Sequence, residues 1–159
     1  MEKGGKKTYK QYIGRYYHLL DEKGRVSIPV AFRKQLTQEV VVTNGLDGAL
    51  FLFNTDQWES FVSRLESSSL FRKINRDLQR LMLNSAVWLK QDSIGRLLLP
   101  EFLLQSGDLK KEGVFAGSGD RVEIWDRTRY HAYLEQIEQN AESIAEEFDQ
   151  GQQGGNREQ

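Results

Sequence analysis

Two short segments of the chain share the pattern Asp-x-x-Gly-Arg, at Asp21–Arg25 and Asp92–Arg96. A carboxylate at the first position can accept hydrogen bonds from backbone N–H groups further along a turn. A glycine at the fourth position adopts a positive φ without strain. The pattern therefore predicts two tight turns that each end in an arginine. The residues predicted to form these turns are Asp21, Gly24, Asp92 and Gly95.

Cationic side chains next to the turn glycines are candidates for contact with nucleic acid. Lys23 and Arg25 flank Gly24, and an arginine suits bidentate contact with guanine whereas a lysine suits phosphate. Arg25 is equally suited to an ion pair with Asp21 that holds the turn, and the residues alone leave both interpretations open. The candidate DNA-binding residues are Lys23, Arg25, Arg33, Arg96, Arg15 and Lys34.

The two turns belong to an internal repeat. Their Asp, Gly and Arg residues coincide at a constant offset of 71 residues, and the only two prolines of the chain fall on equivalent positions. Further along, Val40–Val42 is similar to Val114–Ala116, and Leu50–Asn54 is similar to Val122–Asp126. A match this extended predicts two copies of one structural unit.

Each copy contains four β-prone runs and one short helix, which predicts a β-β-α-β-β unit. In the first copy, Tyr16–Leu20 and Val26–Ile28 surround the turn, and Glu39–Thr43 and Ala49–Phe53 form a second strand pair. The proline of each copy is expected in the first turn of the short helix. Asn54 or Thr55 is the expected N-cap of a following helix.

Helical periodicity follows each copy and completes the predicted organisation. Trp58, Trp88 and Trp125 lie in apolar patterns, so we expect them in the core or an interface. The predicted segments are a flexible basic N-terminus (1–11), repeat 1 (12–57), a helical connector (58–85), repeat 2 (86–129), a long C-terminal amphipathic helix (130–148) and a disordered tail (149–159).

Composition limits the available chemistry. The chain has no cysteine and two histidines, which excludes disulfides, thiolate zinc sites and cysteine nucleophiles. It has no P-loop, no dinucleotide-binding fingerprint and no Gly-x-Ser-x-Gly elbow. A hydrolase built on Asp21 and Asp92 has no support beyond the carboxylates themselves. We therefore expect no enzymatic activity, no cofactor, no metal and no small-molecule substrate.

The formal net charge of −1 hides an uneven distribution. Residues 1–40 contain nine Lys or Arg against four Asp or Glu, whereas residues 131–159 contain one against seven. The basic front half fits a nucleic-acid partner. No apolar run approaches the ~20 residues of a membrane span, and the first fifteen residues lack the apolar stretch of a secretory signal. We therefore expect a cytoplasmic protein without a membrane partner.

The segment Tyr12–Arg33 resembles the opening signature of the MraZ family of bacterial transcriptional regulators. The second turn, Asp92–Arg96, lies where that family carries its second copy, and Ile124–Asp126 resembles its closing strand. The resemblance covers about residues 12–148. It implies an α+β fold in which two tandem AbrB-like β-β-α-β-β repeats form a pseudo-dimeric swapped-hairpin barrel, with a helical connector and a long C-terminal helix.

The resemblance also implies a function. Arg25 matches the DNA-binding arginine of the family's first Asp-x-Lys-Gly-Arg motif. The implied assembly is a homo-oligomeric ring that binds short direct repeats in double-stranded DNA. At the nucleoid, this ring would repress the division and cell-wall gene cluster that contains its own gene. The alternative is an oligomeric structural module with only non-specific DNA affinity, whose acidic C-terminal helix binds a protein partner.

Overall fold

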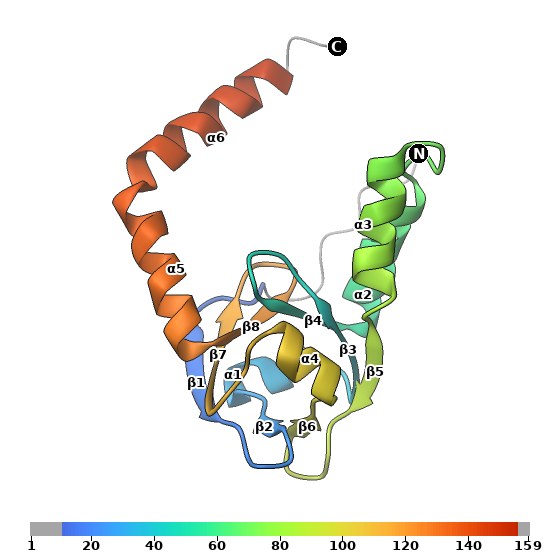
Figure 1. Cartoon of the computed structure of the whole chain (residues 1–159), viewed down its shortest axis with the longest axis vertical. Coiled ribbons are helices and arrows are strands. Elements are labelled where there is room, and N and C mark those ends of the chain that lie inside the picture. Colours follow the sequence, from blue (N-terminus) through green and yellow to red (C-terminus); the bar gives the residue numbers. More distant parts are fainter. Residues whose placement is uncertain (1–10, 156–159) are drawn as a thin grey trace. The chain divides into compact units, whose positions relative to one another are not determined.

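The computed structural model describes residues 11–155, which form an α+β fold (Figure 1). Lys3, Lys6, Lys7 and Lys10, expected in a flexible N-terminus, lie outside the described residues. The strands are β1 (Arg15–Leu19), β2 (Arg25–Ser27), β3 (Glu39–Asn44), β4 (Leu50–Asn54), β5 (Val87–Lys90), β6 (Arg96–Leu98), β7 (Glu112–Gly117) and β8 (Val122–Asp126). The helices are α1 (Val30–Arg33), α2 (Thr55–Glu66), α3 (Lys73–Leu83), α4 (Glu101–Ser106), α5 (Arg127–Gln139) and α6 (Ala141–Gly155).

The strands form two antiparallel sheets that join the repeats. The larger sheet has the order β1-β7-β8-β4-β3-β5, and β2 pairs with β6 in a separate two-stranded sheet. The hairpins β3–β4 and β7–β8 lie within single repeats, as the sequence predicts. The pairs β1–β7, β3–β5, β4–β8 and β2–β6 each join one repeat to the other. The repeats therefore fold as one body that neither could form alone.

Equivalent positions of the two repeats line one shared core. Strand alternation directs every second side chain inward, so both copies contribute the same positions. The equivalent pairs in the buried cluster are Val26 with Leu97, Ile28 with Leu99, Phe32 with Leu103, Leu50 with Val122 and Leu52 with Ile124. The internal repeat seen in the sequence is thus a repeat of core positions.

The strand register corrects one part of the predicted repeat alignment. Val41 lies opposite Phe53, and Val114 lies opposite Trp125, which makes Val41 the equivalent of Val114. The predicted match of Val40–Val42 with Val114–Ala116 is therefore wrong by one residue. Three adjacent valines offer the same β propensity in either register, and only the pairing with the next strand distinguishes the two alignments.

The two prolines lie one residue earlier than predicted. Pro29 and Pro100 directly precede α1 and α4 with ψ of 135° and 150°, so they are the last extended residues and not part of the first turn. Their carbonyls accept the backbone N–H of Phe32 and Leu103, at 2.9 and 3.0 Å. Each proline is thus the last extended residue after a strand, and its carbonyl accepts the first hydrogen bond of the following helix.

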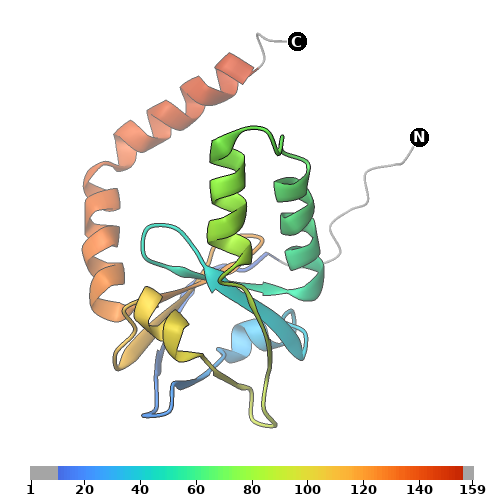
Figure 2. The same cartoon turned by 45° about the vertical axis from the view of Figure 1, so that its right-hand side comes forward.

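The helix after the first repeat begins as predicted. Asn54 is the N-cap of α2, and its side chain accepts the N–H of Gln57, whose side chain accepts the N–H of Asn54 in return. Helices α2 and α3 lie side by side as an antiparallel hairpin in both views (Figures 1 and 2).

The C-terminal unit begins at Thr128 and differs from the predicted single helix over 130–148. Helices α5 and α6 are separated at Asn140, whose side chain donates to the carbonyl of Gln136 at 2.9 Å. This side-chain bond competes with continuous helical bonding at that point. Helix α6 continues to Gly155, so the expectation of disorder from residue 149 is not met over 149–155. Each further residue added to an existing helix gains a hydrogen bond without a new nucleation cost.

Candidate nucleic-acid interface

The first turn, loop 1 (Asp21–Arg25), is organised by its aspartate. Asp21 Oδ1 accepts the backbone N–H groups of Lys23 and Arg25, at 2.9 and 2.8 Å. The N–H of Gly24 donates to the Asp21 carbonyl at 3.1 Å, and Gly24 has a φ of +85°. The N–H of Arg25 lowers the pKa of Asp21, and the N–H of Lys23 and the charges of Arg25 and Arg96 act in the same direction. The carboxylate is therefore held ionised inside the turn.

The cations of loop 1 stay accessible while the turn is held. Arg25 Nε lies 3.3 Å from Asp21 Oδ2, and the Arg25 side chain remains 32% exposed. Lys23 is exposed, and its ammonium forms no ion pair within residues 11–155. The local ion pair considered from sequence is therefore present. It fixes one edge of the guanidinium and leaves the rest of the group able to contact a ligand.

Loop 2 (Asp92–Arg96) repeats this geometry with a different surface. Asp92 Oδ1 accepts the N–H groups of Ile94 and Arg96, at 3.1 and 2.8 Å. Arg96 Nε donates to Asp92 Oδ2 at 2.8 Å, and the side chain is 34% exposed. The backbone and side chain of Arg96 lower the pKa of Asp92. Exposed Ile94 stands where loop 1 has Lys23, so loop 2 has one positive charge fewer.

Each loop is hydrogen-bonded through its glycine carbonyl to the residue that follows the short strand of the other repeat. The N–H of Leu99 donates to the Gly24 carbonyl at 3.0 Å, and the N–H of Ile28 donates to the Gly95 carbonyl at 2.9 Å. Strands β2 and β6 pair directly behind the loops, with Ser27 opposite Arg96. Because β2 and β6 are antiparallel, the loops lie at opposite ends of this short sheet, and both project from the same side of the body (Figures 1 and 2).

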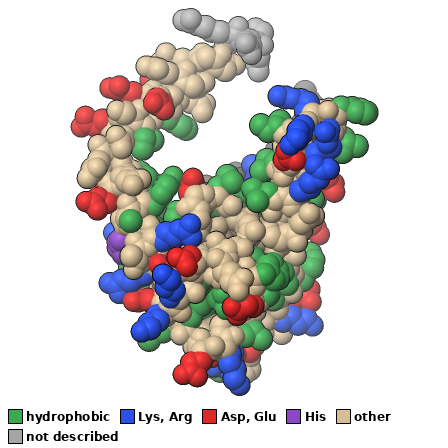
Figure 3. Space-filling model, viewed as in Figure 1, with side chains coloured by type: hydrophobic (Ala, Val, Ile, Leu, Met, Phe, Trp, Pro, Cys, Tyr) green, Lys and Arg blue, Asp and Glu red, His purple; other side chains and the backbone are tan. Residues whose placement is uncertain are grey.

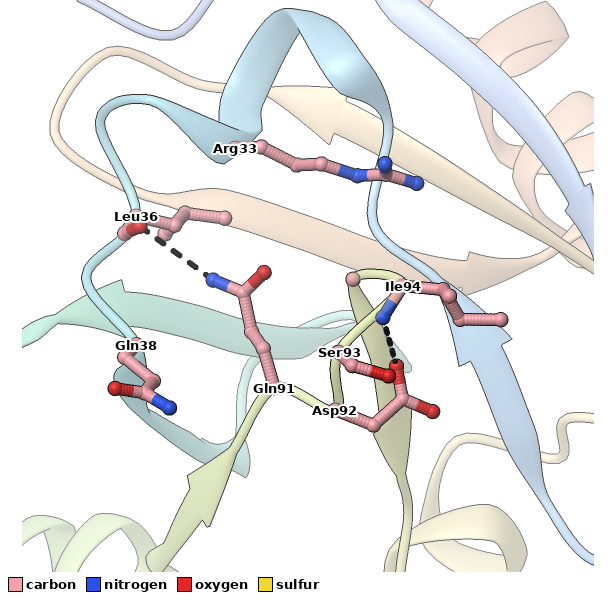
Figure 4. Close-up of a pocket in the computed structure, with 8 residues that line it drawn as sticks. Arg33, Leu36, Gln38, Gln91, Asp92, Ser93 and Ile94 are labelled. Carbon is pink, nitrogen blue, oxygen red and sulfur yellow. Dashed lines mark hydrogen bonds between the residues drawn. The ribbon is translucent and has the colours of Figure 1, made fainter.

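Of the other three candidate residues, Arg33 packs against loop 2, whereas Arg15 lies away from loop 1 along the chain. Arg15 is exposed at the far end of β1, six residues or roughly 20 Å of extended chain before loop 1. Lys34 is exposed directly after α1. Arg33 is half-buried, and its Nε donates to the carbonyl of Ile28 at 2.8 Å. Figure 4 shows its side chain extending from α1 over the segment that carries Ile94.

The geometry gives the two conspicuous carboxylates a turn-forming role. A general acid needs a raised pKa, whereas the pKa values of Asp21 and Asp92 are both lowered. Residues 11–155 contain no group of three or more His, Asp or Glu side chains placed to hold a metal ion. Within the same residues, no helix is long and apolar enough to span a bilayer.

Sequence reasoning missed the residues that support the loops from behind. The sequence suggests either a DNA contact or a solvated helix face for Arg33, and it suggests no role for Leu104. The repeat itself offered a signal for their shared role, because Arg33 and Leu104 occupy equivalent positions at the offset of 71 residues. What lies beneath each loop nevertheless depends on the pairing between the repeats.

Comparison with known proteins identifies the family. A family model described as "MraZ protein, putative antitoxin-like" matches the chain twice, over residues 12–81 and 82–151. Proteins named "Transcriptional regulator MraZ" are 36% identical in Caldanaerobacter subterraneus and 39% identical in Pediococcus pentosaceus. These alignments cover 86% and 85% of this chain, and 96% and 94% of the relatives. A protein of the same name from Thermoanaerobacter sp. is 36% identical over 86% of this chain. The resemblance seen in the sequence is confirmed, and the chain belongs to the MraZ family.

Proposed function

We propose that this protein is a sequence-specific DNA-binding transcriptional regulator that contacts DNA with loops 1 and 2. The observation that carries the proposal is that the two repeats present the same turn on one side of the body, each with an arginine paired with its own aspartate. The naming of its relatives as transcriptional regulators supports the same function.

The chemistry of the loops suits contact with a duplex. With Nε held by Asp21, the two Nη groups of Arg25 can form a bidentate contact with guanine O6 and N7 or with phosphate. The carboxylate is occupied by backbone N–H groups and by its own arginine, which reduces repulsion of the DNA backbone. Lys23 adds a phosphate contact in loop 1 alone. Loop 1 is therefore proposed as the stronger of the two, with Arg15 and Lys34 as peripheral contacts.

We propose further that the cross-repeat pairings form the swapped-hairpin barrel of an AbrB-like pseudo-dimer. In this arrangement one chain supplies the two loops that a symmetric dimer would supply from two chains. The pairings β1–β7 and β3–β5 are equivalent in the two repeats and support this description.

Self-association into a ring is the proposed means of reaching useful affinity. A few phosphate contacts give only ~10⁻⁴–10⁻⁶ M non-specific binding, and identical loops spaced around a ring gain avidity on direct repeats. The α2–α3 hairpin offers an apolar surface for such contacts, with basic side chains beside it (Figure 3). Its exposed apolar residues are Leu70, Phe71, Ile74, Leu78 and Leu81. The proposed target is the regulatory DNA of the protein's own gene cluster, bound as a repressor at the nucleoid.

The test is fluorescence anisotropy of the full chain with its own upstream DNA, against a shuffled duplex of equal composition, at two salt concentrations. We expect at least tenfold preference for the native duplex, which corresponds to about 1.4 kcal/mol. Equal binding to both duplexes that disappears at higher salt would refute sequence recognition. A protein-interaction module would then be the better description, and the exposed apolar surface of α3 is the observation that favours it.

A further inference from the structure

The side chains that support the two loops come from the opposite repeats and differ in chemistry. A Cβ atom built on Gly24 would lie 2.8 Å from Cδ1 of Leu104, whereas one built on Gly95 would lie 2.6 Å from Nε of Arg33. Each glycine thus packs directly on the other repeat's side chain. Arg33 and Leu104 are equivalent positions, so loop 1 rests on an apolar group and loop 2 on a guanidinium.

Arg33 also completes a hydrogen-bonded chain that ends in loop 2. Its Nε donates to the Ile28 carbonyl at 2.8 Å, and the N–H of Ile28 donates to the Gly95 carbonyl at 2.9 Å. Leu104 has no donor to offer the equivalent carbonyl of Leu99. The backbone bond is therefore present at both loops, whereas the side-chain donor that continues it exists only at loop 2.

The position of Arg33 differs from that of an outward-facing phosphate contact. The side chain is half-buried and borders a cavity of about 380 Å³ together with Gln91, Ser93 and Gly95 (Figure 4). Its Nη atoms have no hydrogen-bond acceptor among residues 11–155. Its best-defined contacts are with the backbone that shapes loop 2, directly before Arg96.

We propose that Arg33 is a positioning residue for loop 2, which holds the backbone that presents Arg96 and does not itself bind phosphate. This role rests on the proposed DNA-binding function of the loops. It makes loop 2 dependent on a charged side chain of repeat 1, whereas the equivalent side chain beneath loop 1, Leu104, supplies only apolar packing.

The first test needs no DNA, so its outcome is independent of the proposed function. Rates of backbone amide hydrogen exchange are compared for the full-length wild type, the Arg33→Leu variant and the Arg64→Leu variant. Arg64→Leu is the control, because it removes one positive charge from α2, away from the loops. We expect the amides of Ile94 and Arg96 to exchange about tenfold faster in Arg33→Leu, with loop 1 unchanged. Leucine is tolerated at the equivalent position beneath Gly24, so the variant is expected to fold. Unchanged exchange in loop 2, or an equal rise in both loops, overturns the proposal.

The second test separates positioning from direct contact. Lysine keeps the charge but places a carbon where Arg33 has Nε, so Arg33→Lys should bind DNA as weakly as Arg33→Leu. Neither variant should lose further affinity when Arg96 is already alanine. Restoration of affinity by Arg33→Lys, or a loss by Arg33→Leu that persists beside Arg96→Ala, would assign a phosphate contact and overturn the proposal. Wild-type protein that binds native and shuffled DNA equally refutes the proposed function and leaves the exchange result intact.

Discussion

Replacement of Arg25 by alanine separates the two roles that this side chain can play. Its ion pair with Asp21 joins two partly exposed groups at 3.3 Å, and exposed pairs of this kind contribute only ~0.2–1 kcal/mol to stability. A bidentate contact with guanine contributes ~1–3 kcal/mol, or about fivefold to 150-fold in affinity for each loop engaged. Because backbone N–H groups still hold Asp21, the turn itself should survive the substitution.

The expected result for Arg25→Ala is therefore a large loss of DNA affinity with nearly unchanged thermal stability and oligomeric state. Anisotropy at several salt concentrations identifies the kind of contact. Loss of a base contact lowers the preference for native over shuffled DNA. Loss of a phosphate contact weakens binding to both duplexes and reduces the salt slope by ~0.9.

The matched control for Arg25→Ala is Arg64→Ala. Arg64 is an exposed arginine on α2 whose Nη2 lies 3.5 Å from Asp120 Oδ2, so the control removes the same charge and a similar ion pair away from the loops. Arg25→Ala protein that stays folded and binds the native duplex as tightly as the Arg64→Ala protein would show that loop 1 does not read DNA.

Three other perturbations test the fold, its electrostatics and its surface. Gly24→Ala should lower the free energy of unfolding by about 1–3 kcal/mol, because φ is +85° and the new Cβ would lie 3.1 Å from the Leu99 carbonyl oxygen. Denaturant titration should show a smaller loss for Gly119→Ala, which has the same φ and open space, and equal losses would contradict the packing argument. Burial and then the charge of Arg33 lower the pKa of His18 below 6.5. Unfolded chains then bind the proton more readily, so the free energy of unfolding should fall as pH drops below 6.5. A pKa of 6.5 or higher for His18 in an NMR titration would exclude this pH dependence. Phe71 is 92% exposed, so Phe71→Ser should weaken self-association in sedimentation velocity without a change in melting temperature. Unaltered assembly would show that the connection between α2 and α3, which carries Phe71, lies outside the interface.

The chemistry of the turns could be predicted from local sequence. An Asp-x-x-Gly-Arg segment contains its own acceptor, its own positive-φ residue and its own ion pair, so Asp21 and Gly24 need no distant partner to define the turn. The capping of α2 by Asn54 and the hairpins β3–β4 and β7–β8 are local in the same sense, because a short connection joins the partners. The offsets of 71 and 72 residues further identified which core positions are equivalent.

Partner choice across the repeats was decided only in the tertiary structure. The β-prone residues of strand β1 suit several neighbouring strands, and its pairing with β7 follows from burial of a core shared by both repeats. Trp88 lies in an apolar pattern like the other tryptophans, yet it is 56% exposed on β5, whereas Trp58 and Trp125 are buried. The support of loop 2 by Arg33 depends on the same pairing. Five consecutive residues are enough to define a turn. The side chains that pack beneath the turn come from a segment some 60 residues away in the sequence, and local propensity does not specify that contact.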